Sequence, residues 1–440
     1  MDILVEFKLV LIPIVVFLVV YAAITFELVN KAVAAMSGVS VLVLLHVVGE
    51  HQAVELIDME TIMLLTGMMI IVSILRLSGF FTIVSVKIAE VTQGSPTRIL
   101  VLFSIVTALM SAFLDNVTTV LIIIPIIIEL TRGMGLDPKK YVLSQALISN
   151  IGGTATLIGD PPNIIIGSKV GLTFNQFMFN LAPLVVIVFI IILFALWISN
   201  RDEYKPINTN LTKLLTVQLL MEKIRFEFMN IRIDRSMMHK GLMCLFLAIA
   251  LFMTQTITKL APGVVALSVA MLLFIISKAD VEYVLEEVEW STLMFFAGLF
   301  ILVGVLEETG VIEWIAHHVF VKVGDNPYIA VLMVLWVSGI ISGFLDNIPF
   351  TITMIPIIHL MLETNPIPNN ILWWALAFGA CFGGNITMIG SSANIVSIGI
   401  AKKHGVNISF MDFMKTGAWV TFISLSLASI YLTFFLWMSL

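Results

Sequence analysis

Apolar residues in this chain come in long runs separated by short polar stretches. Several runs reach about 20 residues, which is the length that an α-helix needs to cross the hydrocarbon core of a bilayer. The pattern predicts an all-α polytopic membrane protein with about ten full spans, counting two interrupted helices. We expect the uninterrupted spans near residues 9–27, 31–49, 57–78, 177–199, 240–258, 262–278, 289–309 and 416–437.

Other apolar segments are too short or too polar to cross alone. Residues 80–93 and 311–324 each follow a glycine and mix apolar with charged positions, which predicts amphipathic arms along the membrane interface. Two pairs of legs, the first of about fifteen residues each, instead favour re-entrant helical hairpins, because a full crossing needs about 20 residues and irregular backbone at mid-membrane must be covered by protein or water. These legs are 99–113 with 117–130, and a second pair within 329–363.

Two further apolar helices, 140–170 and 371–400, are predicted to break in the middle. The first contains glycines, which relax the chain, and the pair Pro161-Pro162, in which each proline lacks the backbone N–H donor of a helix. A broken helix leaves unpaired N–H and C=O groups that can hold an ion or a substrate.

Two motifs recur at one spacing, which indicates an internal duplication. FLDNVTT at 113–119 returns as FLDNIPF at 344–350, and GGTATLIGDPPN at 152–163 returns as GGNITMIGSSAN at 383–394. Both offsets are 231 residues (346 minus 115, 383 minus 152). We therefore divide the chain into N-terminal scaffold helices (1–56), a first repeat (57–200), a linker (201–240), further scaffold helices (241–288) and a second repeat (289–440).

Charge predicts the orientation. The linker 201–240 carries eight basic and five acidic residues, so the positive-inside rule places it in the cytoplasm. Counting spans from the linker makes the first hairpin open to the cytoplasm and the second to the opposite side, where no Lys or Arg occurs from 329 to 370. We thus expect inverted-topology repeats with both termini outward. The first apolar run lacks a cleavage pattern, so we expect it to remain as a span in the cell (inner) membrane.

Composition narrows the class of function. The chain is 60% hydrophobic and 12% charged, with a mean hydropathy of +1.08, whereas a soluble domain carries roughly a quarter charged residues. The net charge of −6, without a basic arm, gives no case for nucleic-acid binding. Cys244 and Cys381 lie far apart in apolar helices, and we interpret them as core residues. The pair His317-His318 has no ligand set at zinc spacing.

Asp115 and Asp346 are the principal candidates for chemistry. A carboxylate at the bilayer centre costs about 2.5–3.5 kcal/mol, so it is retained where it faces water, pairs, or binds protons or cations. The alternative is that each aspartate caps the second leg of its hairpin. Sodium is considered at Asp115, Asn116, Asp346 and Asn347, where amides can coordinate a cation or simply stabilise the tip.

The remaining candidate ion- or substrate-binding residues surround the tips and the helix breaks. The positions equivalent to Thr118 and Thr119 in the second copy are Pro349 and Phe350, which have no hydroxyl groups, so the site would be asymmetric. Asp160 is matched by Ser391, which suggests one specialised ion position; a plain Asp-Pro turn is the alternative. Threonines at the breaks can also bond back to their own helix. The further candidates are Asn150, Thr154, Thr156, Asn163, Thr351, Asn385, Thr387, Ser392 and Asn394.

At these residues the chain resembles the ion transporter superfamily, which includes arsenite permeases, D-type sodium/proton antiporters, dicarboxylate/sodium symporters and the P protein. The resemblance covers roughly 57–437 and is strongest to the P-protein and arsenite-permease-like branch. It implies a dimer with a static scaffold and a transport domain that moves as an elevator. The runs that carry it are 113–119, 150–163, 347–356 and 383–394.

The resemblance also bears on the substrate. Dicarboxylate members carry Ser-Asn-Thr at the tips, whereas Asp115 and Asp346 stand at the serine positions here. Carboxylates would repel a dianion, so a citrate-like organic anion is disfavoured. We expect proton- or sodium-coupled cation (Na⁺)/H⁺ exchange first and arsenite efflux second.

Functions of other classes fit less well. An ion channel needs a continuous pore, whereas two hairpins meeting tip to tip form an occluded site. A scaffolding protein would tolerate loss of the acidic tips. No nucleophile–base or metal grouping is evident, so we predict no enzymatic activity. We expect a small inorganic ion or small solute as substrate, Na⁺ or H⁺ as coupling ion, no other cofactor, and the bilayer and a second copy as partners.

Overall fold

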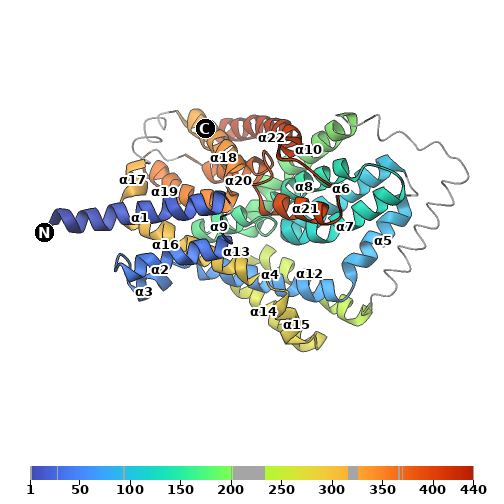
Figure 1. Ribbon diagram of the computed structural model, residues 1–440, viewed down its shortest axis with the longest axis horizontal. Helices are drawn as coiled ribbons and strands as arrows, with labels where there is room; N and C mark the ends of the chain where they lie inside the picture. Colours follow the sequence, from blue (N-terminus) through green and yellow to red (C-terminus); the bar gives the residue numbers. More distant parts are fainter. Residues whose placement is uncertain are drawn as a thin grey trace, which may run out of the picture.

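The computed structural model describes residues 2–26, 28–92, 95–199, 201, 233–315, 326–364, 367, 368 and 370–439, and all of its regular elements there are helices (Figure 1). Most of the linker and residues 316–324 of the second predicted arm lie outside these residues. The first half contains α1 (Asp2–Thr25), α2 (Lys31–Leu44), α3 (Glu50–Glu55), α4 (Met59–Leu77), α5 (Phe80–Thr92), α6 (Pro96–Phe113), α7 (Asn116–Gly133), α8 (Pro138–Gly153), α9 (Pro161–Val170) and α10 (Phe174–Ser199).

The second half repeats this order, and most of its helices begin at the same 231-residue offset: α2 and α14 start at 31 and 262, α4 and α16 at 59 and 290, and α9 and α21 at 161 and 392. The register therefore extends upstream of residue 57, where the sequence motifs placed the start of the first repeat. The helices are α12 (Arg235–Met253), α13 (Gln255–Thr258), α14 (Pro262–Ser277), α15 (Val281–Glu286), α16 (Trp290–Glu308), α17 (Val311–Ile315), α18 (Pro327–Phe344), α19 (Asn347–Thr364), α20 (Ile371–Gly383), α21 (Ser392–Lys403) and α22 (Phe410–Ser439).

The helix pattern confirms the predicted polytopic class. Among the described residues, eight helices are long and apolar enough to cross a membrane, and four shorter apolar helices accompany them. Both interrupted helices break as expected, at residues 154–160 and 384–391. Free, buried Cys244 and Cys381 agree with their interpretation as core residues.

Several predicted bounds were wrong. Each leg of the first hairpin has 18 residues instead of about fifteen, because Pro96 occupies the first turn of α6 and α7 continues to Gly133. The helix α12 begins within the predicted linker, because Asp234 caps it by accepting from the Met237 N–H at 2.9 Å. The sequence patterns also missed the short helices α3 and α15, and α2 ends at Leu44 instead of 49.

Helix packing is related by a pseudo-two-fold axis. The helix α2 packs on α16 of the other half, and its equivalent α14 packs on α4. Likewise α7 packs on α21 while α19 packs on α9, so each hairpin contacts the broken helix of the opposite half. The two halves are interlocked and do not form separate domains.

The equivalent helices α4 and α16 run antiparallel. Arg76, at the end of α4, pairs with Glu287, just before α16, at 2.8 Å. Gln52, upstream of α4, donates to Glu308 at the end of α16 at 2.6 Å. A two-fold axis that relates two antiparallel helices is perpendicular to both of them. The repeats therefore have inverted topology, as predicted.

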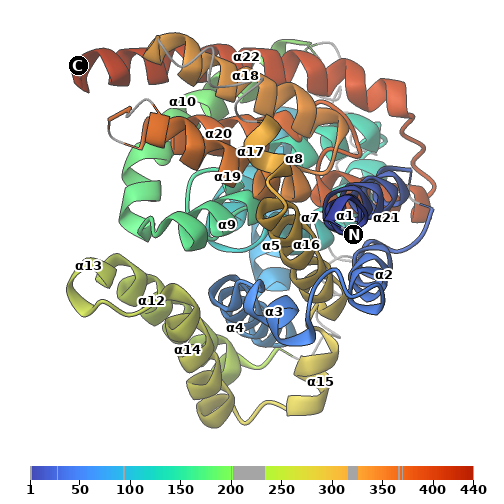
Figure 2. The same ribbon diagram turned by 90° about the vertical axis from the view of Figure 1, so that its left-hand side faces the viewer.

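The helices form two groups that lie side by side. In Figure 2 the hairpins, the broken helices, α10 and α22 occupy the upper part, while α2, α4, α12 and α14 occupy the lower part. Within the upper group, backbones approach closely: a Cβ at Gly152 would lie 2.5 Å from the Ala108 oxygen, and one at Gly383 would lie 2.3 Å from the Gly339 oxygen. Glycine at these positions lets each hairpin seat its broken helix.

Candidate functional site

The first hairpin tip is held by its own aspartate. Asp115 caps α7, with Oδ1 accepting from the Thr118 N–H at 2.8 Å and Oδ2 accepting from the Thr118 hydroxyl. The Thr119 hydroxyl donates to the Asp115 carbonyl at 3.0 Å. Capping thus occurs at this tip, and both threonine hydroxyls are engaged within it.

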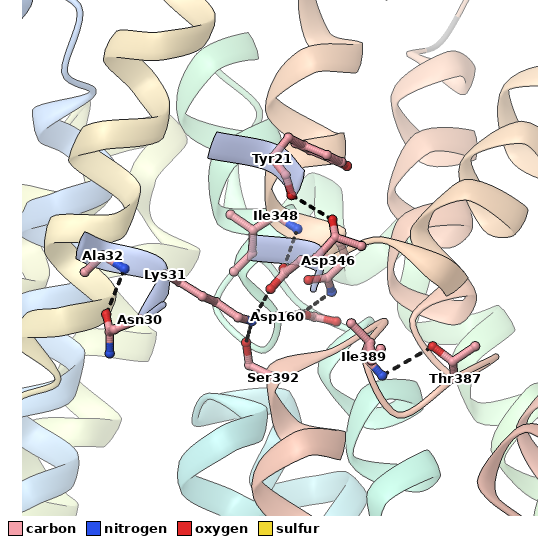
Figure 3. A network of polar contacts seen from close by, with 12 residues as sticks. Tyr21, Asn30, Lys31, Ala32, Asp160, Asp346, Ile348, Thr387, Ile389 and Ser392 are labelled. Carbon is pink, nitrogen blue, oxygen red and sulfur yellow. Dashed lines mark hydrogen bonds and ion pairs between the residues drawn. The ribbon is translucent and has the colours of Figure 1, made fainter. Parts of the chain in front are cut away.

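The second tip makes different contacts. Asp346 Oδ1 accepts from the Ile348 N–H at 3.1 Å, and Oδ2 pairs with the Lys31 ammonium, which comes from the first turn of α2 (Figure 3). The Asp346 side chain is only 3% exposed. The aspartate is therefore both a cap and the buried half of an ion pair between distant parts of the chain.

Asp160 joins the two hairpins. The Asn116 side-chain amide donates to Asp160 Oδ1 at 3.2 Å, and the equivalent amide of Asn347 donates to the same oxygen at 3.5 Å. Asp160 is fully buried, and its Oδ2 is one of the few buried polar atoms without a hydrogen-bond partner among the described residues. A buried carboxylate oxygen in this condition can accept from a water molecule or bind a proton or a cation.

A set of buried amides surrounds Asp160. The Asn150 oxygen accepts from Asn116 and from the Ser391 hydroxyl, each at 3.0 Å. The Asn150 amide group donates to Asn385 at 2.8 Å and to Asn394 at 3.0 Å. One asparagine in the first broken helix thus contacts the first hairpin and three residues of the second broken helix.

The predicted asparagines and threonines of the helix breaks close the loops. Asn163 donates to the carbonyls of Thr154 and Thr156 at 3.1 and 2.8 Å. Asn394 bonds the Gly384 and Thr387 carbonyls at 2.8 and 3.1 Å.

The threonine hydroxyls make local contacts. Thr156 and Thr387 donate to backbone carbonyls of the hairpin legs, at Ala112 and Gly343. The hydroxyls of Thr154 and Thr351 donate to carbonyls in their own helices at 2.8 and 2.7 Å. These residues shape the site, and a direct ligand role for their hydroxyls stays a prediction.

A cavity of about 560 Å³ opens beside Asp160. Groups from both halves line it, and its described lining contains three carboxylates, Asp115, Asp160 and Glu289, but no basic side chain. Of the other predicted residues, Asn116, Asn347, Ser391 and Ser392 reach it, whereas Asp346 does not. The structure thus places the two tip aspartates in different surroundings.

Sequence reasoning missed Glu289 and Lys31. Glu289 is the N-cap residue of α16 and accepts from the Thr292 hydroxyl at 2.9 Å. Burial, followed by the charge of Asp115, raises the pKa of Glu289 to about 7. The repeat offset could have identified Glu289, because Asp58 precedes the equivalent helix α4; Lys31 has Pro262 at its equivalent position and offered no such signal.

Comparison with known proteins gives a consistent family. The profile of a family described as Citrate transporter (CitMHS) matches residues 21–379. The chain is 41% identical over 423 residues to an uncharacterized transporter of Mycobacterium tuberculosis, covering 95% of this chain and 96% of the relative. It is 40% identical over 427 residues to a 46 kDa membrane protein of Mycobacterium leprae, covering 96% and 97%. Similarity to the P protein of Homo sapiens is 34% over 489 residues, covering 94% of this chain and 58% of that protein.

Proposed function

The chain belongs to the CitMHS citrate transporter family of membrane transporters, and from this premise we propose that it is a secondary active transporter that exchanges sodium ions for protons. The surroundings of Asp160 are the main observation that supports this proposal. Its Oδ2 is buried and has no hydrogen-bond partner in the part of the chain that the structure describes, and its Oδ1 accepts from an amide of each hairpin. A hard cation prefers carboxylate, amide and carbonyl oxygens, which this place offers.

The charge of the cavity supports a cation over an anion. Asp115, Asp160 and Glu289 give it an acidic lining, and each of them that is ionised repels an anion strongly at short range in a poorly hydrated site. The same carboxylates can bind protons when sodium leaves. Competition between the two cations for one group couples their movements in opposite directions.

Unequal packing of the equivalent helices supports alternating access of the elevator type. The helix α9 packs on α4, where the Ser168 hydroxyl donates to Asp58 Oδ1 at 2.9 Å. The equivalent contact between α21 and α16 is at most marginal. If the contact between α9 and α4 broke and the equivalent contact between α21 and α16 formed, the hairpins and broken helices would slide along α4 and α16. The site would then open on the other side.

Two other substrates remain as candidates. The family description favours citrate or a related organic anion. Neutral arsenious acid could bind the asparagine amides around Asp160, as the resemblance to arsenite permeases suggests. We further infer a homodimer in the cell membrane, with the linker cytoplasmic and both termini outward.

Flux measurements in proteoliposomes test the proposal. An imposed pH gradient should drive ²²Na⁺ uptake by the wild-type protein, whereas Asp160→Asn should abolish uptake and Ser439→Ala, at the far end of α22, should leave it unchanged. The same vesicles are assayed with labelled citrate and arsenite. Citrate or arsenite uptake without sodium/proton exchange would replace the proposed substrate, and steady single-channel currents would refute a transporter.

A further inference from the structure

The two hairpin tips differ in the hydrogen-bond donors that they supply to their aspartates. At the first tip, Thr118 supplies both its N–H and its hydroxyl to Asp115. Pro349 stands at the equivalent position of the second tip, and proline has neither donor. Asp346 therefore uses one oxygen to accept from Ile348 and has the other free for a group outside the hairpin.

The side chain of Lys31 contacts this second oxygen of Asp346. Its ammonium contacts Asp346 Oδ2 and lies 3.3 Å from the Ser392 hydroxyl, so it bridges the second tip and the second broken helix (Figure 3). The equivalent positions in the other half are Pro262 for Lys31 and Pro161 for Ser392. The arrangement is thus restricted to one half of a duplicated site.

The backbone of Lys31 is fixed in place. Asn30 caps α2 by accepting from the Ala32 N–H at 2.9 Å, and the same oxygen accepts from the Ser291 hydroxyl at 3.2 Å. Because α2 also packs on α16, the ammonium is presented from the scaffold to the hairpin. The lysine side chain is 27% exposed, whereas that of Asp346 is 3% exposed.

We propose that Lys31 is a built-in counter-cation, which occupies at Asp346 the position that a transported sodium ion would otherwise take and so confines sodium binding to the Asp160 side of the site. The choice of sodium rests on the function proposed above. The ammonium contacts a carboxylate oxygen and a hydroxyl oxygen, both of which are ligands that suit a hard monovalent cation.

Removal of the ammonium creates an unbalanced buried charge. Breaking a buried ion pair by removing one partner is costly, because the other charge stays in a poorly solvated place. With Lys31 neutralised, Asp346 and Ser392 would recruit a cation from solution. The wild-type chain avoids this second site by carrying the cation covalently.

Sodium binding at equilibrium tests the proposal in full-length protein purified in detergent. We expect Lys31→Cys to bind one more ²²Na⁺ per protomer than the wild type at saturation, measured from pH 6 to pH 9. Treatment of the same sample with aminoethyl methanethiosulfonate, which restores an ammonium on a lysine-like stem, should remove the additional ion. Neutral methyl methanethiosulfonate should not remove it.

The matched controls isolate Asp346. The double variant Lys31→Cys/Asp346→Asn should lose the additional ion, and Lys31→Arg should behave as the wild type. If Lys31→Cys is unfolded on size exclusion, Lys31→Gln takes its place. Equal sodium stoichiometry in the folded neutral variant and the wild type at every pH would overturn the proposal.

The design separates this inference from the proposed function. The measured quantity is the difference between the variant and the wild type, so it does not depend on how many ions the wild type binds. Absence of sodium binding in the wild type would refute sodium exchange, while a gain at Lys31→Cys that depends on Asp346 would still support the role of Lys31.

Discussion

Asn116 and Asn347, which occupy equivalent positions in the two hairpins, donate to the same carboxylate oxygen, Oδ1 of Asp160. One charged group in the first broken helix therefore receives a hydrogen bond from each half of the molecule. Its second oxygen has no partner among the described residues. A cation at that oxygen would be held at the meeting point of both repeats.

Substitution of Asp160 by Asn keeps the shape of the side chain and removes its charge. We expect the variant to fold with equal or greater stability, because it removes a buried carboxylate that has no ion-pair partner among the described residues. Sodium at about 100 times its Kd should stabilise the wild type by about 2.7 kcal/mol, and should leave the variant unchanged. Thermal melts in sodium and choline chloride measure this, and a sodium-dependent melt of Asp160→Asn would place the ion elsewhere.

Two substitutions separate the roles of Asp115. Asn retains an N-cap oxygen, whereas Ala removes it, so Asp115→Ala should lose about 1 kcal/mol of stability relative to Asp115→Asn. If the charge also contributes about 1.4 kcal/mol to cation binding, both variants should bind sodium about tenfold more weakly. Denaturation and ²²Na⁺ titration provide the two readouts. Wild-type affinity in Asp115→Asn would leave capping as the only role of the residue.

Glu289 predicts a pH dependence. Its pKa is raised to about 7 by burial and by Asp115, while Thr292 and Arg76 act in the opposite direction. A raised carboxyl pKa favours the protonated form in the folded state, so its stabilising contribution is present below the unfolded pKa and is lost as pH rises through 7. Glu289→Gln should therefore gain on the order of 2 kcal/mol over the wild type at pH 8–9, and little at pH 4. Parallel stability–pH curves for the two proteins would contradict this.

The glycine at 152 should be intolerant of a side chain. A Cβ there would lie 2.5 Å from the Ala108 backbone oxygen, which cannot rotate away. We expect Gly152→Ala to destabilise the protein by about 1–3 kcal/mol through overpacking of α6 against α8. Gly399→Ala in α21 is the control, because a Cβ at Gly399 would have no atom of the described residues within 4 Å. Equal melting temperatures for the two variants would show that α6 can move aside.

A cross-link can test the elevator motion. Asp58 and Ser168 join α4 to α9 through a 2.9 Å hydrogen bond in this arrangement. Mercury should bridge the double variant Asp58→Cys/Ser168→Cys and stop exchange, and dithiothreitol should restore it. The single variants should keep their flux in mercury, since native Cys244 and Cys381 are buried. Full exchange by cross-linked protein would exclude sliding between α4 and α9.

The sequence by itself determined the class, the duplication and most of the helices. Long apolar runs leave no alternative to membrane helices, glycine with proline forces the break near 152–162, and the recurring glycines mark the break near 383–391, because these effects are local to the chain. The offset between Asp115 and Asp346 likewise followed from the motifs alone. Helix bounds were less exact, since a cap such as Asp234 competes with the charge pattern that suggested a linker.

Only the tertiary structure decided how the equivalent residues differ in use. From the sequence, Asp115 and Asp346 were a matched pair; in the fold, Asp115 faces the cavity beside Glu289, and Asp346 is paired with Lys31 from 315 residues away. Likewise, the central role of Asp160 depends on amides delivered by two hairpins. Contacts between segments so distant depend on how helices pack, and no local pattern of apolar and polar positions encodes which charge will meet which.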